Sequence, residues 1–314
     1  MRLAVTGATG FVGGAVCRAA VDAGWSVLAL GRRPAMDSAH IGGAPYRRWD
    51  ITAGPLPDPP AVDAVVHCAA SATDTGVERE VWATNLTGTR HVLRSFGAAR
   101  MVHVSTASVY DPYRPTIMAV ESEAPVHRYL NAYGASKAAA ERAVLAESDR
   151  EAIVLRPHAV YGPGDTTLLP RLLENVRAGR LLAVGDGRVL LSVTSVGNLV
   201  SACLLAASGP AARGVFNIAD DGVLTVDQGL RGLLASAGVQ ARPCYLPTRL
   251  AWPTATVLES AQRLVGRPAR LRLNRYLISQ FAMERTLDIS AARRHLGYRP
   301  TGIDFTAISP VPAG

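Results

Sequence analysis

Tyr133 and Lys137 have residue types and a spacing that suit acid–base chemistry. They are four residues apart, and Lys137 is the only lysine in a chain that uses arginine at every other such position. On a helix, residues i and i+4 lie on one face, so the ammonium of Lys137 would stand close to the phenol of Tyr133. A nearby positive charge lowers the pKa of tyrosine from its ordinary value of about 10. We therefore predict that Tyr133 exchanges protons with a substrate and that Lys137 assists it.

Two hydroxyl side chains can complete such a site. Ser105 and Thr106 come at the end of the apolar run Met101–Ser105, which predicts a strand. Ligands of open α/β sheets bind at the carboxyl ends of the strands. A hydroxyl placed there can hydrogen-bond a substrate carbonyl and stabilise the charge that develops on its oxygen. The residues themselves leave open whether Ser105 or Thr106 has this role.

A glycine-rich turn near the N-terminus is typical of dinucleotide binding. The segment Val5–Gly14 reads Val-Thr-Gly-Ala-Thr-Gly-Phe-Val-Gly-Gly and follows the first predicted strand. Its glycines permit a tight turn and close approach of the backbone to a pyrophosphate, and the N-terminus of the next helix stabilises negative charge. The predicted cofactor contacts in this turn are Gly7, Thr9, Gly10, Phe11, Val12 and Gly13.

The end of the second predicted strand favours NADP(H) over NAD(H). Gly31 stands where an NAD-specific site would place an acidic residue against the ribose 2′-hydroxyl. Arg32 and Arg33 follow, and guanidinium groups can bind a 2′-phosphate through paired hydrogen bonds. Further predicted cofactor contacts are Asp50 and Ile51 near the adenine, and the small residues Ala69 and Ala70.

The elements that must position these residues alternate between strands and helices over the first 160 residues. This alternation predicts an α/β fold, a doubly wound parallel sheet of the Rossmann type with a smaller C-terminal substrate-binding cap. We expect a dinucleotide-binding domain over residues 1–160, with returns to the sheet near 190–220, and a cap formed mainly by residues 161–314. The predicted strands are Leu3–Thr6, Ser26–Leu30, Ala64–Cys68, Met101–Ser105, Ala152–Arg156 and Val215–Ile218, and the predicted helices are Val12–Ala23, Glu80–Phe96, Ala132–Ala146, Leu168–Ala178 and Val196–Ala207.

Composition narrows the possible partners and location. The 314 residues are 48% hydrophobic and 18% charged, which indicates a globular chain. The net charge of +8 comes from scattered arginines, so we expect a small-molecule substrate and no nucleic acid. No apolar run is long enough to predict a membrane span. Four widely separated cysteines form neither a metal-ligand pattern nor a disulfide framework, so we expect no metal and a cytoplasmic location.

These motifs together resemble the extended short-chain dehydrogenase/reductase family, including its NAD-dependent epimerase/dehydratase and 3β-hydroxysteroid dehydrogenase-like branch. The resemblance rests on the glycine turn, Tyr133-x-x-x-Lys137, and the segments Asn85–Thr89, Val104–Tyr110, Arg156–Asp165 and Leu296–Pro300. It implies that Thr106 is the catalytic hydroxyl, with Ser105 as the alternative, that Tyr133 is the acid/base, and that Lys137 also binds the ribose. It further implies that Asn85 supports the site. The remaining cofactor contacts implied are Ser105, Tyr133, Lys137, Pro157 and Val160.

Two departures from the family pattern bear on the substrate. Sugar-nucleotide members carry an asparagine where this chain has Ala159, and Gly197 stands where many members have aspartate. We therefore expect an NADP(H)-dependent oxidoreductase for a secondary alcohol or ketone of a hydrophobic small molecule. The alternatives are a sugar-nucleotide epimerase or 4-ketoreductase, and a non-catalytic NADP-binding regulator.

The last two predictions concern an apolar substrate pocket and a homodimer. The resemblance to the family implies a homodimer with an interface formed by helices near Glu80–Phe96 and Ala132–Ala146. The stretch Leu246–Ala282 has apolar residues at helical spacing, which are typical of ordinary core more often than of an apolar substrate pocket, and both remain open here. They are Leu250, Trp252, Val257, Leu258, Leu264, Leu271, Tyr276, Leu277 and Phe281.

Overall fold

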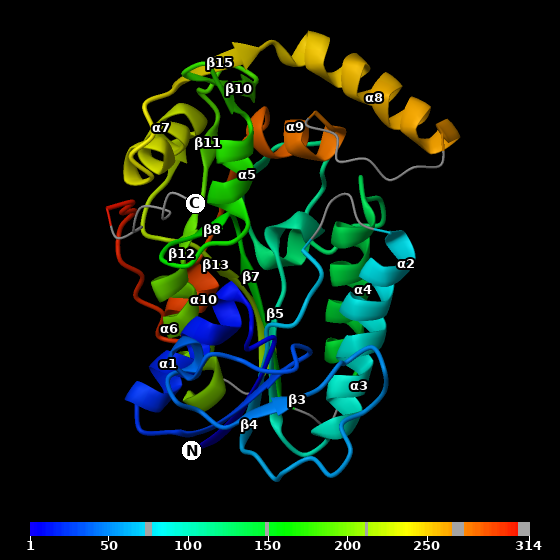
Figure 1. Cartoon of the computed structure of the whole chain (residues 1–314), viewed down its shortest axis with the longest axis vertical. Helices are drawn as coiled ribbons and strands as arrows, with labels where there is room; N and C mark the ends of the chain where they lie inside the picture. The colour runs from blue at the N-terminus through cyan, green and yellow to red at the C-terminus, as the bar shows by residue number, and fades with distance from the viewer. Residues whose placement is uncertain (73–76, 148–150, 211–212, 266–272, 307–314) are drawn as a thin grey trace.

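A seven-stranded parallel sheet forms the centre of the chain in the computed structural model, which describes residues 1–72, 77–147, 151–210, 213–265 and 273–306 (Figure 1). The strand order is β13-β7-β5-β4-β1-β2-β3. From the middle of the sheet, β1, β2 and β3 follow one another toward one edge, and β4, β5, β7 and β13 follow one another toward the other edge. This is the doubly wound order. The prediction of fold class is therefore confirmed. The strands are β1 (Arg2–Thr6), β2 (Ser26–Gly31), β3 (Tyr46–Arg48), β4 (Ala64–His67), β5 (Arg100–Val104), β7 (Ala152–Pro157) and β13 (Arg213–Ile218).

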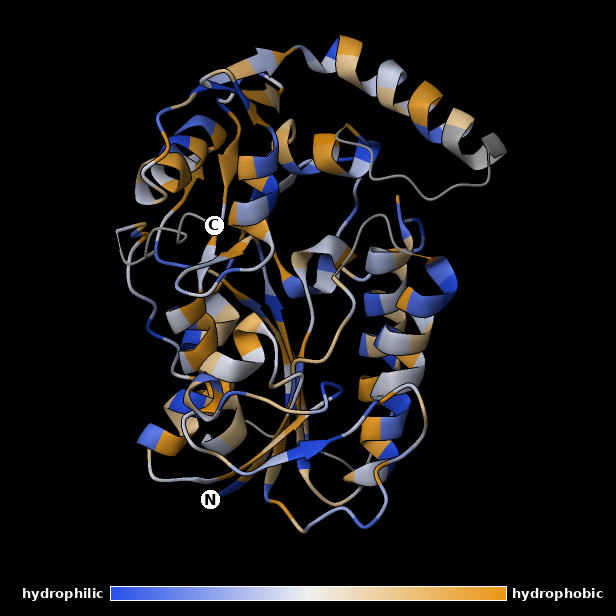
Figure 2. Cartoon of the chain, viewed as in Figure 1, coloured by the Kyte–Doolittle hydropathy of each residue, from blue (hydrophilic) through white to orange (hydrophobic). Residues whose placement is uncertain are grey.

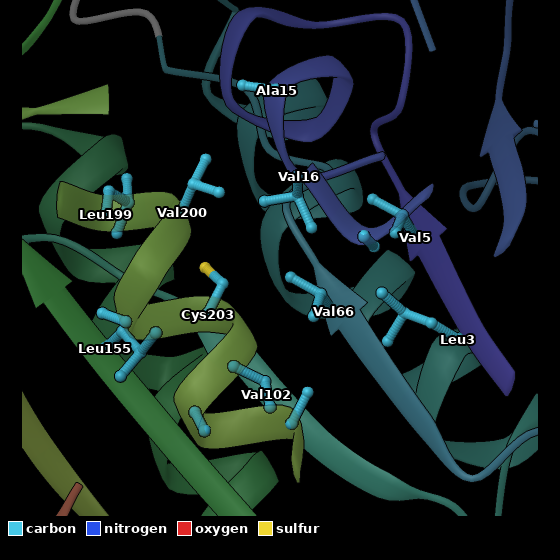
Figure 3. Close-up of a cluster of buried hydrophobic side chains, with 14 of the residues drawn as sticks. Leu3, Val5, Ala15, Val16, Val66, Val102, Leu155, Leu199, Val200 and Cys203 are labelled. Atoms are coloured by element: carbon cyan, nitrogen blue, oxygen red, sulfur yellow. The ribbon is translucent and has the colours of Figure 1, made fainter. Parts of the chain in front are cut away.

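Helices cover both faces of this sheet (Figure 1). One face packs against α1 (Phe11–Asp22) and α6 (Val196–Ser208), and the other against α3 (Gly88–Ser95) and α4 (Ala132–Ala146). Figure 3 shows side chains of α1 and α6, among them Val16 and Cys203, near strand residues such as Val66. The central strands are buried on both faces, which is why they are nearly continuous apolar runs in the sequence.

Between segments that belong to the second region, the chain returns to the central sheet. Strand β13 extends the sheet by pairing with β7, with Val215 opposite Val154. The short helices α2 (Glu78–Trp82) and α10 (Ser290–His295) also belong to this part of the molecule. The carboxyl ends of the strands all point toward the second region, so the loops after β1, β4 and β5 meet there (Figure 1).

The second region lies above those carboxyl ends and has its own apolar core (Figure 2). It contains three small sheets, ordered β15-β10-β9, β14-β11-β16-β6 and β12-β8. Its helices are α5 (Leu168–Glu174), α7 (Val226–Ser236), α8 (Thr248–Val265) and α9 (Arg275–Phe281). The strands are β6 (Thr116–Ala119), β8 (Val160–Tyr161), β9 (Val176–Arg177), β10 (Arg180–Val184), β11 (Leu190–Leu191), β12 (Thr194–Ser195), β14 (Leu224–Thr225), β15 (Arg242–Leu246) and β16 (Arg285–Leu287).

Two predicted helices differ from the structure. The helix predicted over Leu168–Ala178 ends at Glu174, and Val176 and Arg177 form β9. Ala178 and Gly179, which both have positive φ, then turn the chain into β10. The helix predicted over Glu80–Phe96 is interrupted by a π-helical turn at Ala83–Thr87. Such turns occur often at functional sites, and this one contains Asn85. Within the described residues, no helix has both the length and the hydropathy that a membrane span requires.

Candidate active site

The glycine turn after β1 brings two backbones too close together for side chains. Gly7 has a φ of 71°, and a Cβ added to it would lie 2.6 Å from the backbone nitrogen of Ala69, which follows β4. A Cβ on Gly13 would lie 2.2 Å from the carbonyl oxygen of Gly7. The N-cap of α1 is Gly10, and no side-chain hydrogen bond caps the start of the helix. This open cradle of backbone at a helix N-terminus fits a dinucleotide pyrophosphate.

Three arginines gather at the carboxyl ends of β2 and β3. Arg32 and Arg33 follow β2 and are exposed, while Arg48 ends the neighbouring strand and donates from Nε to the carbonyl of Arg32 at 3.4 Å. The hydroxyl of Tyr46 contacts the carbonyls of Gly31 at 2.8 Å and Arg33 at 2.6 Å, which fixes this loop. Sequence reasoning missed Arg48 because it missed the short strand β3, although the adjacent Arg47-Arg48 pair was a visible signal.

The residues predicted near the adenine have different surroundings. The Asp50 carboxylate accepts from the backbone and hydroxyl of Thr52 at 2.9 and 2.8 Å, and these bonds, with the charges of Arg32 and Arg48, lower its pKa. Ile51 is 7% exposed and its side chain packs at Gly88, where a Cβ would lie 2.5 Å away. Only the backbone of Ile51 is therefore available to a cofactor.

Ser105 and Thr106, left as alternatives by the sequence, have different partners. The Ser105 hydroxyl donates to the buried carboxylate of Glu141. The Thr106 hydroxyl donates to Ser108 Oγ at 3.2 Å and caps the following turn by accepting from the backbone of Ser108 at 3.1 Å. It is also near enough to Tyr133 to lower the pKa of that phenol, so of the two hydroxyls it is the one that acts on the predicted acid/base.

Helix α4 approaches the Thr106 turn closely because of Gly134. A Cβ at that position would lie 2.9 Å from the carbonyl oxygen of Ser108. Asn131 begins the helix by accepting from the backbone of Gly134 at 3.0 Å. Beneath the site, Glu141 is fully buried and bound to Arg156 of β7, with an Nη2 to Oε2 distance of 2.7 Å. The helix that carries Tyr133 and Lys137 is thus held both to the Thr106 turn and to the sheet.

The pKa of Tyr133 is raised by burial of its phenol, and two groups oppose the rise. These are the hydrogen bond with Thr106 and the positive charge of Arg171 on α5. The sequence prediction assigned this effect to Lys137, which is not among the groups that shift the Tyr133 pKa in the structure. Arg171 was missed by sequence reasoning, because nothing local in the apolar run Leu168–Leu173 connects it with Tyr133.

Lys137 is directed toward the end of β5. Its side chain is 2% exposed, and its ammonium donates to the carbonyl of Val104 at 2.7 Å and to Nε2 of His103 at 3.3 Å. Burial keeps the pKa of His103 well below its ordinary range, so its ring is neutral and its Nε2 accepts the hydrogen bond from Lys137. Burial also lowers the pKa of Lys137 to about 8, against the opposing charge of Glu141. The ammonium therefore lies at the floor of the site, still charged at neutral pH.

Asn85 lies behind the predicted catalytic residues. Its side-chain amide donates to Ser136 Oγ at 2.9 Å, and it pairs with the backbone of Ser71 through bonds of 2.7 and 3.1 Å. Ser136 is between Tyr133 and Lys137 on α4, and Ser71 follows β4. Asn85 thus ties the helix to a loop of the cofactor region, which is an arrangement suited to positioning.

One cavity of about 1090 Å³ connects the two regions of the molecule. Its lining brings together most of the predicted site residues, namely Gly7, Gly10, Phe11, Val12, Gly13, Ala70, Ser105, Thr106, Tyr133, Lys137, Pro157 and Val160. The remaining predictions lie outside that lining and are Thr9, Arg32, Arg33, Asp50, Ile51, Ala69 and Asn85. Of these residues, Arg32, Arg33 and Asp50 lie with the arginine cluster at the exposed edge of the sheet, beyond the glycine turn.

The apolar wall of the cavity differs from the one predicted. Tyr276, Leu277 and Phe281 of α9 do line it, but Leu250, Val257 and Leu258 of α8 are exposed. Figure 2 shows hydrophobic and hydrophilic turns alternating along α8. Trp252 packs in a separate cluster. Leu271 lies outside the described residues, as does the side chain of Leu264. The wall comes instead from α5, β10 and α7, through Leu168, Leu172, Leu181, Leu230 and Leu233.

Comparison with known proteins agrees with this geometry. Residues 3–219 match the model of the NAD dependent epimerase/dehydratase family. The chain is 33% identical to a 2-alkyl-3-oxoalkanoate reductase of Stenotrophomonas maltophilia, over 96% of this chain and 95% of the relative. It is also 33% identical to a 4-hydroxy-2-methyl-3-oxo-4-farnesyl-3,4-dihydroquinoline-1-oxide ketoreductase of Stigmatella aurantiaca, over 95% and 92% of the two chains. Among solved structures, MoeE5 in complex with UDP-glucuronic acid and NAD has a TM-score of 0.73 at 25% identity, covering 98% of this chain and 96% of that one.

Proposed function

The chain belongs to the NAD dependent epimerase/dehydratase family and is an oxidoreductase of CH–OH and C=O groups, and we propose that it reduces the ketone of a hydrophobic small molecule with NADPH. The observation that carries the proposal is the cavity of about 1090 Å³, which Thr106 and Tyr133 line together with an apolar wall from the second region. Two relatives named as ketone reductases, each matched over nearly its whole length, support it.

In this proposal, the residues of the chain handle the oxygen of the ketone. The reduced nicotinamide, when bound, supplies the hydride that adds to the carbonyl carbon. Thr106 hydrogen-bonds the carbonyl oxygen and orients it, and Tyr133 donates its phenolic proton to that oxygen as the secondary alcohol forms. The raised pKa of Tyr133 keeps the phenol protonated at neutral pH, which suits reduction. Lys137 places its positive charge at the floor of the cavity, bound to Val104 and His103, and its proposed cofactor contact is the ribose.

The function is tested by NADPH oxidation with methyl ketones of increasing chain length. Each methylene buried against the leucine wall should raise kcat/KM by about fourfold, which corresponds to ~0.8 kcal/mol per buried CH₂. The loss of NADPH absorbance measures the rate. If no ketone is reduced while UDP raises the melting temperature, the sugar-nucleotide alternative replaces this proposal, because a ligand that binds only the folded state stabilises it.

The preference for NADP(H) rests on the arginine cluster. We expect Arg32→Ala to raise KM for NADPH by about 10- to 100-fold, the range of a charge-assisted hydrogen bond, with little change in KM for NADH. Arg47→Ala is the matched control, since the Arg47 guanidinium donates to the carbonyls of Pro57 and Asp58 and not into the cluster. Equal effects of Arg32→Ala on the two cofactors would show that this residue does not bind the phosphate.

We further propose a cytoplasmic homodimer. The four cysteines, all within the described residues, are unpaired, as expected in a reducing compartment. At the two ends of α2, Val77 and Trp82 are 48% and 36% exposed, which supports an interface on the side of the molecule formed by α2 and α4.

A further inference from the structure

The outward face of α8 is apolar. Leu250, Val257 and Leu258 are 54%, 66% and 40% exposed, and positions i, i+7 and i+8 of a helix lie on one side of it. The other side carries Ala251 and Ala255, which are buried in a small cluster with α9. Figure 1 shows α8 along the outer edge of the second region, beyond α9. A helix that served only its own fold would turn its large apolar residues inward, so this face indicates an interaction surface.

The chain segment that contains α8 is strongly basic. Residues 248–275 include six arginines and one acidic residue, Glu259. The carboxylate of Glu259 is already bound to Arg275, with an Oε2 to Nε distance of 2.8 Å, so its charge is neutralised locally. Arg249, next to Leu250 at the start of the helix, is exposed. The apolar face of α8 therefore belongs to a segment that attracts anions.

A row of arginines lies on the small sheet whose last strand leads into α8. In the sheet β15-β10-β9, Arg180 is directly opposite Arg242 on one side and Arg177 on the other. All three are exposed, and no carboxylate of the described residues lies within ion-pair distance of them. Leu182, two residues after Arg180 and so on the same face, is 63% exposed. Like charges directly opposite one another in a sheet repel, so an anionic surface over this arginine row would stabilise it.

The arginine row lies at an opening of the substrate cavity. Leu182 and Arg177 are exposed and also belong to the cavity lining, so the cavity reaches the exterior along β9 and β10. Helix α9, on which α8 packs, contributes Leu277 and Phe281 to the same lining. A partner bound by α8 and by the arginine row would therefore lie beside a route by which an apolar ketone enters.

We propose that α8 and the arginine row bind the surface of a bilayer that contains anionic phospholipids. In this arrangement α8 lies parallel to the bilayer without crossing it. Its exposed leucines and Val257 enter the boundary between headgroups and acyl chains, and the arginines contact the phosphates. The inference goes beyond ketone reduction, since this surface is separate from the Thr106 and Tyr133 site.

Charge favours a bilayer over a second copy of the chain on this face. An apolar helix face alone fits either occupant. Two copies joined through α8 would bring two basic segments together, and their repulsion opposes the contact, whereas an anionic bilayer neutralises both the α8 segment and the arginine row. The homodimer proposed above uses the side formed by α2 and α4, which leaves α8 exposed.

Flotation with lipid vesicles tests the proposal, using phosphatidylcholine alone and phosphatidylcholine with about 30% phosphatidylglycerol. Wild type should float with the anionic vesicles, and binding should weaken by about tenfold or more on the neutral vesicles or on raising NaCl from about 0.1 to 0.5 M. Val257→Glu should weaken binding to the anionic vesicles by about 10- to 100-fold, because it removes a buried apolar side chain and adds a repelled charge. Arg180→Gln should weaken it by about fivefold.

Ile117→Glu is the matched control. Ile117 is 66% exposed, like Val257, but lies on β6 in a different sheet. This variant should bind the anionic vesicles within about twofold of wild type, because its added charge is away from the bilayer. All three variants should reduce a short, water-soluble ketone at the wild-type rate, since none of the changed residues lines the cavity.

Failure of wild type to float with anionic vesicles would overturn the proposal, and so would equal losses of binding in Val257→Glu and Ile117→Glu. If wild type does not float and sedimentation shows a self-association that Val257→Glu abolishes, the face belongs to a second copy of the chain instead. Activity with the soluble ketone separates these results from the proposed function. An enzyme that reduces the ketone without floating loses only the membrane inference, and one that floats but reduces no ketone loses only the function.

Discussion

Replacing Tyr133 with phenylalanine should lower kcat for ketone reduction by about 10²- to 10⁴-fold, the range of general acid–base catalysis. Tyr133 is partly buried, lines the cavity together with Thr106, and is the proton donor of the proposed mechanism. Steady-state rates with saturating NADPH at pH 7 measure the effect, because the raised pKa keeps the wild-type phenol protonated there. Binding of NADPH, followed by its fluorescence, should change by less than about threefold, since the pyrophosphate and ribose contacts remain.

Tyr129→Phe is the matched control for Tyr133→Phe. The Tyr129 hydroxyl donates to the backbone carbonyl of Val126 at 2.8 Å and does not line the main cavity. We expect this control to reduce ketones at close to the wild-type rate while losing some stability, because one hydrogen bond is removed. A Tyr133→Phe enzyme with near-normal kcat would exclude the mechanism proposed here.

Replacing Lys137 with methionine should reduce kcat/KM by about 10²- to 10³-fold, the cost of removing one preorganised charged donor. The ammonium is fixed at the floor of the cavity by Val104 and His103, so its positive charge is already in place when the cofactor binds. Lys137→Arg should not restore activity, because a planar guanidinium does not fit the space of a compact ammonium. Arg142→Met, at an exposed arginine of the same helix, should have nearly wild-type kinetics.

The same Lys137→Met variant should alter how stability depends on pH. The pKa of Lys137 is about 8 in the folded chain and 10.5 for an ordinary lysine. Between these values the unfolded chain binds more protons, so wild type gains stability from this group as pH rises from 8 to 10.5 and loses it as pH falls through 8. The gain should be about 3 kcal/mol, at ~1.36 kcal/mol per pKa unit. Urea unfolding of both proteins measures it, and parallel stability curves over this range would contradict the buried position of the ammonium.

Much of the fold could be predicted because its local signals agree with one another. The strands β1, β2, β4, β5 and β7 are short apolar runs, and each of the first two is followed by residues whose types depend on backbone geometry or charge, such as Gly7 and Arg32. The small strands of the second region were not predicted, because two- and three-residue strands have no periodicity to detect. The π-helical turn around Asn85 was also not predicted.

The source of the apolar wall shows a similar limit. The residues of α8 have helical apolar spacing, which sequence reasoning left open between core and pocket, yet Leu250 and Val257 are 54% and 66% exposed. Periodicity identifies an apolar face but not the surface that it meets. The leucines of α5, β10 and α7 line the cavity because the second region closes over the carboxyl ends of the sheet.

The sequence by itself determined the chemistry available to this protein: a glycine turn that tolerates no side chain, paired arginines in place of an acid, and a tyrosine one helical turn from the only lysine. These are local properties, set by residue type and by spacing along one element. The tertiary structure decided which groups meet. It directs Ser105 toward Glu141 and Thr106 toward Tyr133, and it places Arg171, from another region, near the same phenol. Contacts between residues distant in sequence depend on how the elements pack, and no local pattern records that packing.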